Sequence, residues 1–246
     1  MTTAPLLAAL LAALSLAPSA QAQETGADAP ARSAPEPVGS FDVDQQAVER
    51  GRAVVVGAFG ADSQQLGTTQ RNCMGCHDLQ GQGDGSAAFP RLTVQSAWYL
   101  YKQLTDYASG ARPNPIMSPI AQALTTAQME DVAAYYAAQQ ADYLPPARDY
   151  DPLLIQEGGA LSAMGSTERQ IQACVNCHGP AGSGLPPVYP YLAGQYAGYL
   201  QLQLQLWQQG VRRNSPLGVM ALIAKNMTAR DIEAVSAYFE TVRPEG

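Results

Sequence analysis

The stretch Cys73-Met74-Gly75-Cys76-His77 recurs as Cys174-Val175-Asn176-Cys177-His178, and the two pentapeptides contain every cysteine and histidine of the 246-residue chain. In each copy the two thiols lie about one helical turn apart, and a histidine directly follows the second cysteine. Thiols at this separation add to the two vinyl groups of one porphyrin edge, while the adjacent histidine reaches the iron. The sequence therefore predicts two covalently attached c-type haems, with attachment at Cys73, Cys76, Cys174 and Cys177 and iron ligation by His77 and His178.

A Cys-x-x-Cys pair also occurs in zinc sites, in thioredoxin-like redox sites and in disulfides. Zinc would require two such pairs without obligatory histidines. A redox motif would not place a histidine after the second cysteine in both copies. Haem attachment is the interpretation that accounts for both pentapeptides.

An internal repeat extends well beyond the two motifs. Residues 90–112 align with residues 190–212 at an offset of 100, and ten of these 23 positions are identical. Further along the chain, residues 117–132 align with 220–235 at an offset of 103. The repeat predicts two domains built on one plan.

The N-terminal residues 1–22 are typical of a signal peptide. An apolar run at 6–16 precedes Ala20-Gln21-Ala22, a small-residue cleavage site before Gln23, although no Lys or Arg precedes the run. No later stretch approaches the roughly 20 apolar residues of a membrane helix, so membrane association would require a partner. Export and haem attachment together predict a periplasmic protein.

Two further segments mark the expected domain boundaries. Residues 23–40 are rich in Ala, Pro, Gly and Ser and predict a flexible leader. The prolines within 144–152 forbid a continuous helix and stiffen the connection. We therefore expect one domain at 41–143 and a second at 144–246.

The pattern of apolar residues predicts an all-α fold. Thr125 and Thr228 stand at N-cap positions, and Gly110 and Gly210 follow helix ends. Residues 200–206 alternate Leu and Gln as a half-buried strand would, but these residues favour a helix and the repeat partner does not alternate. Helices are expected at about 45–58, 69–76, 96–108, 126–139, 153–163, 168–177, 196–209 and 228–240.

With these features the chain resembles the cytochrome c4 family, dihaem electron carriers built from two class I cytochrome c domains. The resemblance covers about residues 48–242 and lies in the paired haem motifs, the repeated Pro-x-Leu…Gln…Tyr-Leu…Gln-Leu…Gly-x-Arg segment and a following methionine. It implies iron ligation by histidine and methionine, and haems that face one another across a pseudo-twofold interface.

The position in the repeat distinguishes the candidate methionine ligands. Met117 lies in a proline-rich loop at 112–117 and Met220 holds the equivalent place, so these two are predicted to bind iron. Met129 and Met227 have Ile232 and Leu124 as repeat partners, which ordinary core packing explains better.

Other polar side chains are candidates for supporting roles. Arg112 and Arg212 are candidates for neutralising haem propionates, as are Arg91, Tyr99 and Tyr199, with solvation at the surface as the alternative. Gln103 and Gln203 are expected to form hydrogen bonds at the domain interface.

The formal net charge of −7 arises mainly from the first half of the chain. Residues 37–143 hold six basic and ten acidic side chains, whereas 144–246 hold seven and eight. An acidic chain is not typical of proteins that bind nucleic acids or anionic membranes. We expect the first domain to dock against a basic patch on a redox partner.

The resemblance implies single-electron transfer and not enzymatic catalysis. The main hypothesis is a periplasmic carrier between a quinol-oxidising complex and a terminal oxidase or reductase. The alternative is a cytochrome subunit that accepts electrons from a periplasmic dehydrogenase. A haem enzyme such as a peroxidase would need acid or base groups near an open iron position, and the chain has no spare histidine.

Overall fold

The structure is a computed structural model that describes residues 1, 43–57, 72–140, 142, 145–146 and 148–243. Residues 35–246 form one compact unit. The predicted signal peptide, the leader and the boundary residues 143 and 144 lie outside the described residues, so these predictions stay predictions.

Within the described residues, each half of the repeat forms the same series of five α-helices. The first half contains α1 (Gln45–Val55), α2 (Met74–His77), α3 (Ala97–Ser109), α4 (Met117–Gln122) and α5 (Thr126–Ala137). The second half contains α6 (Pro152–Met164), α7 (Val175–His178), α8 (Ala197–Gln208), α9 (Val219–Lys225) and α10 (Ala229–Thr241), with short 3-10 turns η3 (Pro180–Gly182) and η4 (Pro216–Gly218). The described residues contain isolated β-bridges but no named strand, which confirms the all-α prediction.

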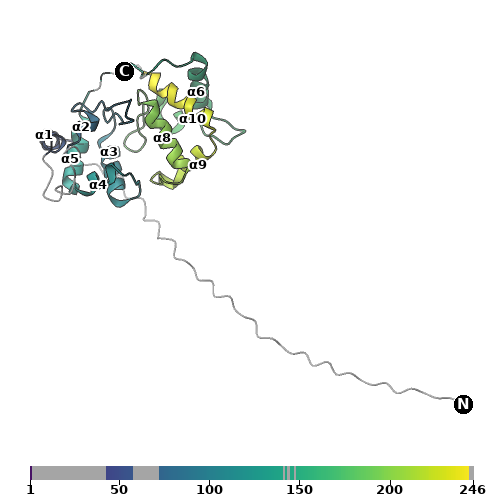
Figure 1. Ribbon diagram of the computed structural model, residues 1–246, viewed down its shortest axis with the longest axis horizontal. Coiled ribbons are helices and arrows are strands. Elements are labelled where there is room, and N and C mark those ends of the chain that lie inside the picture. Colours follow the sequence, from purple (N-terminus) through teal and green to yellow (C-terminus); the bar gives the residue numbers. More distant parts are fainter. Residues whose placement is uncertain (2–42, 58–71, 141, 143–144, 147, 244–246) are drawn as a thin grey trace. The chain divides into compact units, whose positions relative to one another are not determined.

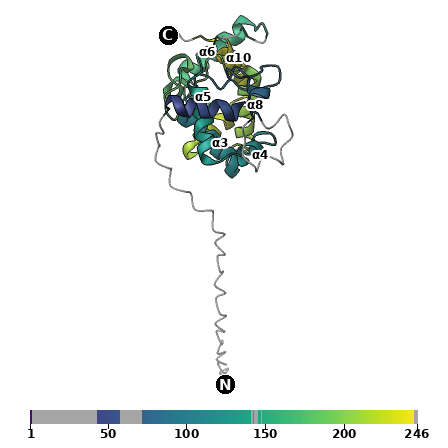
Figure 2. The ribbon, with the colours of Figure 1, turned by 90° about the vertical axis from the view of Figure 1, so that its left-hand side faces the viewer.

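The helices of the two halves pack in the same way. In the first half α1 packs on α5, and α3 contacts both α4 and α5. In the second half α6 packs on α10, and α8 contacts both α9 and α10. Figure 1 shows α8, α9 and α10 close together, and α3 and α4 lie side by side in Figures 1 and 2. The repeat in sequence is therefore a repeat in packing.

A glycine allows the first and last long helices of each half to cross closely. A Cβ atom on Gly51 of α1 would lie 2.0 Å from the carbonyl oxygen of Asp131 on α5. A Cβ atom on Gly158 of α6 would lie 2.0 Å from the carbonyl oxygen of Ala234 on α10. Since no side chain fits at either crossing, both contacts require glycine.

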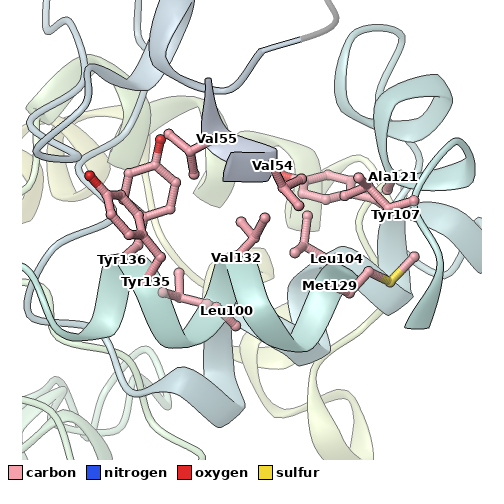
Figure 3. Packing of buried hydrophobic residues seen from close by; sticks show 12 residues of the cluster. Val54, Val55, Leu100, Leu104, Tyr107, Ala121, Met129, Val132, Tyr135 and Tyr136 are labelled. Atoms are coloured by element: carbon pink, nitrogen blue, oxygen red, sulfur yellow. The ribbon is translucent and has the colours of Figure 1, made fainter. Parts of the chain in front are cut away.

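Apolar side chains between the crossed helices form the core of each half. In the first half Val54 of α1 and Val132 of α5 point toward one another, with Leu104 of α3 beside them (Figure 3). Met129 belongs to this cluster, and Met227 belongs to the corresponding cluster of the second half. The prediction that these two methionines serve core packing is confirmed.

Helix ends follow the predicted capping residues. Thr125 and Thr228 accept hydrogen bonds from the third backbone N–H of α5 and α10, and each helix start is a complete capping box. Gly110 ends α3 in the left-handed conformation, with φ of 80°. The alternating Leu and Gln residues lie in α8, as predicted, where Leu200 and Gln203 are buried and Leu202 is exposed.

The second haem motif occupies a shorter helix than the sequence predicts. The expected helix at 168–177 is wrong over its first part, because Ser166 and Ile171 exchange two backbone hydrogen bonds that close a turn. Only Val175–His178 is helical there. The corresponding expectation at 69–76 is also too long, since α2 begins at Met74, and residues 69–71 lie outside the described part.

Candidate haem sites

Each haem motif begins a single helical turn. Cys73 is the N-cap of α2 and Cys174 the N-cap of α7. The backbone N–H of His77 donates to the carbonyl of Cys73, and that of His178 to the carbonyl of Cys174, each at 2.9 Å. This turn brings the two cysteines of each motif to one face. All four thiols are free of disulfides.

A backbone carbonyl orients each histidine ring. Nδ1 of His77 donates to the carbonyl oxygen of Pro90 at 3.0 Å, and Nδ1 of His178 donates to that of Pro190 at 2.9 Å. Because a carbonyl only accepts, the proton is fixed on Nδ1 and the lone pair on Nε2 is left for a metal. Burial lowers the pKa of both rings, although the hydrogen bond to the carbonyl acts in the opposite direction.

The predicted methionine ligands lie at equivalent places in the two halves. Met117 is the first residue of α4, and its N–H donates to Oδ1 of Asn114 at 2.8 Å. Met220 is the second residue of α9, and its N–H donates to Oγ of Ser215 at 3.3 Å. The prediction of a loop was wrong in this detail, because local caps start a short helix in both halves. Both methionines are half-buried.

The arginines that end the repeated segment are buried. Arg112 and Arg212 are 4% and 5% exposed. Surface solvation, the alternative interpretation, is therefore wrong for these residues, and for Arg91, which is 4% exposed.

Two glutamines hold the buried arginines across the two halves. Oε1 of Gln203 accepts from Nη2 of Arg112 at 2.7 Å and from Nη1 of Arg212 at 2.8 Å. Oε1 of Gln103 accepts from Nη1 of Arg112 at 2.9 Å and from Nη2 of Arg212 at 3.3 Å. The prediction that these glutamines form hydrogen bonds between the halves is confirmed.

Tyr199 completes this cluster. Its hydroxyl accepts from Nη2 of Arg112 at 2.8 Å. Burial by itself would raise the pKa of Tyr199, but the charges of Arg112 and Arg212 outweigh burial and hold the pKa below its ordinary value. The cluster thus concentrates positive charge in a buried place.

A second pair of glutamines contributes contacts that the sequence did not predict. Gln95 exchanges two hydrogen bonds with the backbone of Tyr191, at 2.8 and 3.0 Å. Gln195 does the same with the backbone of Arg91, at 3.0 Å for both bonds. Both glutamines occur at the same position of the repeat, and that identity was the available signal. Their reciprocal bonds relate the halves by an approximate twofold axis.

The residues present fit a haem c in each half. Each half offers two free thiols one turn apart and an imidazole whose Nε2 is available. Trp207 provides a further sign, because its Nε1–H is buried with no hydrogen-bond acceptor among the described residues. The guanidinium of Arg212 lies 3.9 Å from the centre of the Trp207 ring. A haem carboxylate would satisfy both groups.

Within the described part of the chain, no helix has the length and apolar character needed to cross a membrane.

Comparison with known proteins places the chain among c-type cytochromes. The cytochrome c family profile matches residues 61–138. The thiosulfate dehydrogenase electron acceptor of Stutzerimonas stutzeri (strain A1501) is 44% identical over 175 residues, which are 69% of this chain and 78% of that protein. Cytochrome c4 of Thiocapsa roseopersicina is 36% identical over 180 residues, 72% of this chain and 91% of that protein.

Two solved structures are similar in fold. Thiosulfate dehydrogenase (TsdBA) from Marichromatium purpuratum superposes with a TM-score of 0.68 at 36% identity, over 79% of this chain. The similar region is only 40% of that longer protein. Reduced cytochrome c4 from Pseudomonas stutzeri superposes with a TM-score of 0.62 at 31% identity, over 70% of this chain and 93% of that one.

These similarities extend over both halves of the chain, and the fold repeats as the sequence repeats. Class I cytochrome c domains carry haem c bound covalently through the cysteines of Cys-x-x-Cys-His, and they transfer electrons without catalysing a reaction of a substrate. The chain belongs to the cytochrome c4 family of dihaem electron carriers.

Proposed function

We propose that this protein is the dihaem electron acceptor of a periplasmic dehydrogenase that oxidises thiosulfate. The observation that carries the proposal is the level of identity. The chain is 44% identical to a thiosulfate dehydrogenase electron acceptor and 36% identical to a cytochrome c4, over similar shares of its length. The similar region in a solved thiosulfate dehydrogenase supports the same assignment.

The proposed ligands are His77 and Met117 for the first iron and His178 and Met220 for the second. A bound haem supplies a one-electron iron couple. Nε2 of each histidine would be free to bind the iron because Nδ1 is held by a proline carbonyl. A methionine sulfur as the second ligand would favour the ferrous state and raise the reduction potential. Thiols at Cys73, Cys76, Cys174 and Cys177 attach the two porphyrins.

The buried arginines are proposed to neutralise haem propionates. Arg112 lies 4.6 Å from the centre of the Tyr107 ring, and Arg212 lies 3.9 Å from that of Trp207, at matching positions of the repeat. Two cations held by amide and phenol oxygens leave positive charge uncompensated, and carboxylates would offset it. Propionates held in this way would bring both haems toward the contact between the halves.

Two iron centres in one chain accept two electrons, one at each iron. Electrons from a dehydrogenase would enter one half and pass to the other, since the cluster of Arg112, Arg212, Gln103 and Gln203 joins the two halves directly. The protein contributes orientation, burial and tuning of the iron, and it makes or breaks no substrate bond.

A first experiment tests the ligand set. The near-infrared methionine-to-iron charge-transfer band of the oxidised, fully haem-loaded protein should have the intensity of two haems per chain. Replacing Met220 with alanine should halve this intensity, whereas replacing the core residue Met227 with leucine should preserve it. Intensity for one haem or none in the unaltered protein would contradict the proposed ligation.

A second experiment tests the electron donor. Oxidised protein is mixed with a thiosulfate dehydrogenase and thiosulfate, and the ferrous haem absorbance is followed. We expect reduction of both haems, and no reduction when thiosulfate or the dehydrogenase is omitted. No reduction by the complete mixture would contradict the proposal.

The cytochrome c4 relatives favour a second candidate function, a carrier between a quinol-oxidising complex and a terminal oxidase or reductase. The same absorbance measurement distinguishes the two, with a quinol-oxidising complex and its quinol in place of the dehydrogenase. Fast reduction by that complex together with none by the dehydrogenase would establish the second candidate.

A periplasmic location and two domains, at 41–143 and 144–246, complete the proposal. The supporting observations are the signal-like residues 1–22, the leader at 23–40 and the repeat. Mass spectrometry of the protein from a periplasmic extract should show a mature chain that begins at Gln23 and carries two haems. A chain that retains residue 1 in the cytoplasm would refute it.

A further inference from the structure

Asn114 and Asn214 stand at the same position of the repeat but have different partners. In the first half, Oδ1 of Asn114 accepts from the backbone N–H of Ile116 at 2.9 Å and of Met117 at 2.8 Å. Asn114 therefore caps the start of α4 and interacts only with its neighbours in sequence through these bonds.

Asn214 reaches into the other half instead. Its Nδ2 donates to Oε1 of Gln103 at 2.9 Å and to Oδ2 of Asp106 at 2.6 Å. Its Oδ1 accepts from Nε of Arg212 at 2.9 Å. The guanidinium of Arg212 can only donate, so the atom of the Asn214 amide that it contacts must be the oxygen and the other must be the nitrogen. Both amide protons of Asn214 thus point at acceptors on α3.

The acceptors on α3 are buried and well held. Gln103 and Asp106 are both 8% exposed. Asp106 also accepts from Nζ of Lys102 at 2.7 Å. A short hydrogen bond to a carboxylate in a buried place is among the stronger polar contacts.

The segment between Asn214 and Met220 depends on such an anchor. Leu217 is 91% exposed and has a φ of 53°, a conformation that costs a non-glycine residue energy. Met220 itself is held by a long bond of 3.3 Å to Oγ of Ser215. In the first half, the described residues between Asn114 and Met117 contain no positive φ. Because the segment is strained and weakly capped, its conformation requires constraints from outside.

We propose that Asn214 is a positioning residue that fixes the Met220 segment against α3 of the first half, so that methionine ligation of the second iron depends on contact between the halves. This inference rests on the proposed ligation by Met220. The first iron has no such dependence, since Asn114 caps the Met117 helix from within its own half. The two sites are therefore alike in ligands and unlike in what holds the sulfur.

The test compares the isosteric changes Asn214→Asp and Asn114→Asp in full-length, haem-loaded protein. At 214 an aspartate loses both donors and faces Asp106. At 114 it keeps the acceptor that the cap uses. The near-infrared band should fall from two haems' worth per chain to one in N214D, and one of the two reduction potentials should become more negative. N114D should retain both bands.

Two further variants distinguish loss of the contact from the effect of an added charge and from a general loss of structure. Asn214→Ala removes the contact without adding a charge and should also lose one band. Adding Asp106→Asn to N214D exchanges donor and acceptor across the same contact and should restore at least half of the lost intensity.

The outcomes separate this inference from the ligation on which it rests. A charge-transfer intensity below that of two haems per chain in the unaltered protein would overturn both the ligation by Met220 and the role of Asn214. If the unaltered protein, N214A and N214D all show the intensity of two haems per chain, only the positioning role of Asn214 is overturned. Loss in N214D with no recovery in the double variant would also overturn it, since the contact with Asp106 would then not be the cause.

Discussion

At the scale of single residues, a few carbonyl oxygens determine the chemistry of the sites. The carbonyl oxygens of Pro90 and Pro190 fix the protons of His77 and His178 on Nδ1, so the same histidine nitrogen is free in each half. The amide oxygen of Gln203 stabilises two guanidinium groups at once. A buried cation that loses such an acceptor retains its desolvation cost, so these acceptors matter more than exposed polar groups do.

Replacing Gln203 with leucine should therefore destabilise the protein. The change leaves Arg112 and Arg212 each without one acceptor in a buried place, and we expect a loss of about 2–4 kcal/mol in the free energy of unfolding. Denaturant titration of the haem-loaded protein measures it. The control is Gln205→Leu on the same helix, where the side chain is exposed and a change within about 0.5 kcal/mol is expected. Equal stability of the two variants would show that Gln203 does not support the arginines.

At the scale of secondary structure, the helix crossings and helix starts determine the fold of each half. The α1–α5 and α6–α10 pairs cross at Gly51 and Gly158. Ion pairs accompany both crossings, between Arg50 and Asp131 at 2.8 Å and between Arg230 and Glu157 at 2.8 Å. Exposed arginines contribute little stability, so close packing is the larger effect.

Replacing Gly51 with alanine tests the crossing. The new methyl group would overlap the carbonyl of Asp131, a backbone atom that cannot move aside, and we expect a loss of about 3 kcal/mol. Gly198→Ala in α8 is the control. No atom lies within 4 Å of a Cβ there, so we expect no loss and a gain of up to about 1 kcal/mol. Thermal unfolding of both variants gives the comparison, and an unchanged G51A would refute close crossing at this residue.

The stability that Asp231 contributes at the start of α10 depends on pH. Burial alone would raise its pKa, but hydrogen bonds from Thr228 and Arg169 outweigh burial and lower the pKa below the ordinary value of 3.8. A carboxylate with a lowered pKa stabilises the fold above its unfolded pKa, and this contribution is lost as the pH falls through the folded pKa.

Asp231→Asn should thus be less stable than the unaltered protein at neutral pH, and the difference should shrink as the pH falls below about 4. Denaturant titrations at a series of pH values measure this difference. A gap between the two proteins that stays constant across the acid range would contradict the role of the charge.

At the scale of the whole molecule, the repeat has diverged in charge and in contacts. The first half carries most of the acidic excess, whereas residues 170–230 contain no Asp or Glu. The halves meet through paired glutamines, through buried arginines and through Asn214. The two proposed haem sites therefore have different surroundings, although both halves are built on the same plan.

Electron exchange with a partner that docks on the first half should weaken with added salt. Charges at an acidic surface attract a basic partner over roughly 10 Å at 0.1 M salt, and screening shortens that range. Stopped-flow rates measured from low to high ionic strength should fall. A charge-neutralising Asp84→Asn variant in the first half should show a weaker dependence than Glu157→Gln in the second half. Rates that do not depend on salt in any of the three proteins would exclude electrostatic steering.

The haem motifs, the repeat and the helical class could be predicted from the sequence because each depends on local spacing. Residues three apart meet on one helical turn, and a threonine caps a helix through contacts with the next three residues. The lengths of the short helices that carry the haem motifs and the two methionines could not be predicted. Backbone pairing between Ser166 and Ile171 and the caps at Asn114 and Ser215 set these boundaries, and such contacts outweigh intrinsic propensity.

The sequence by itself thus determined that the chain folds twice on one plan, and it indicated which cysteines are proposed to attach haem and which histidines are proposed to bind iron, since these follow from chemistry within a few residues. Only the tertiary structure decided that Arg112 and Arg212 are buried, that Gln95 and Gln195 pair reciprocally and that Asn214 joins the other half. The physical reason is that burial and hydrogen bonding between residues about 100 positions apart depend on how two folded surfaces meet, and no local pattern encodes that meeting.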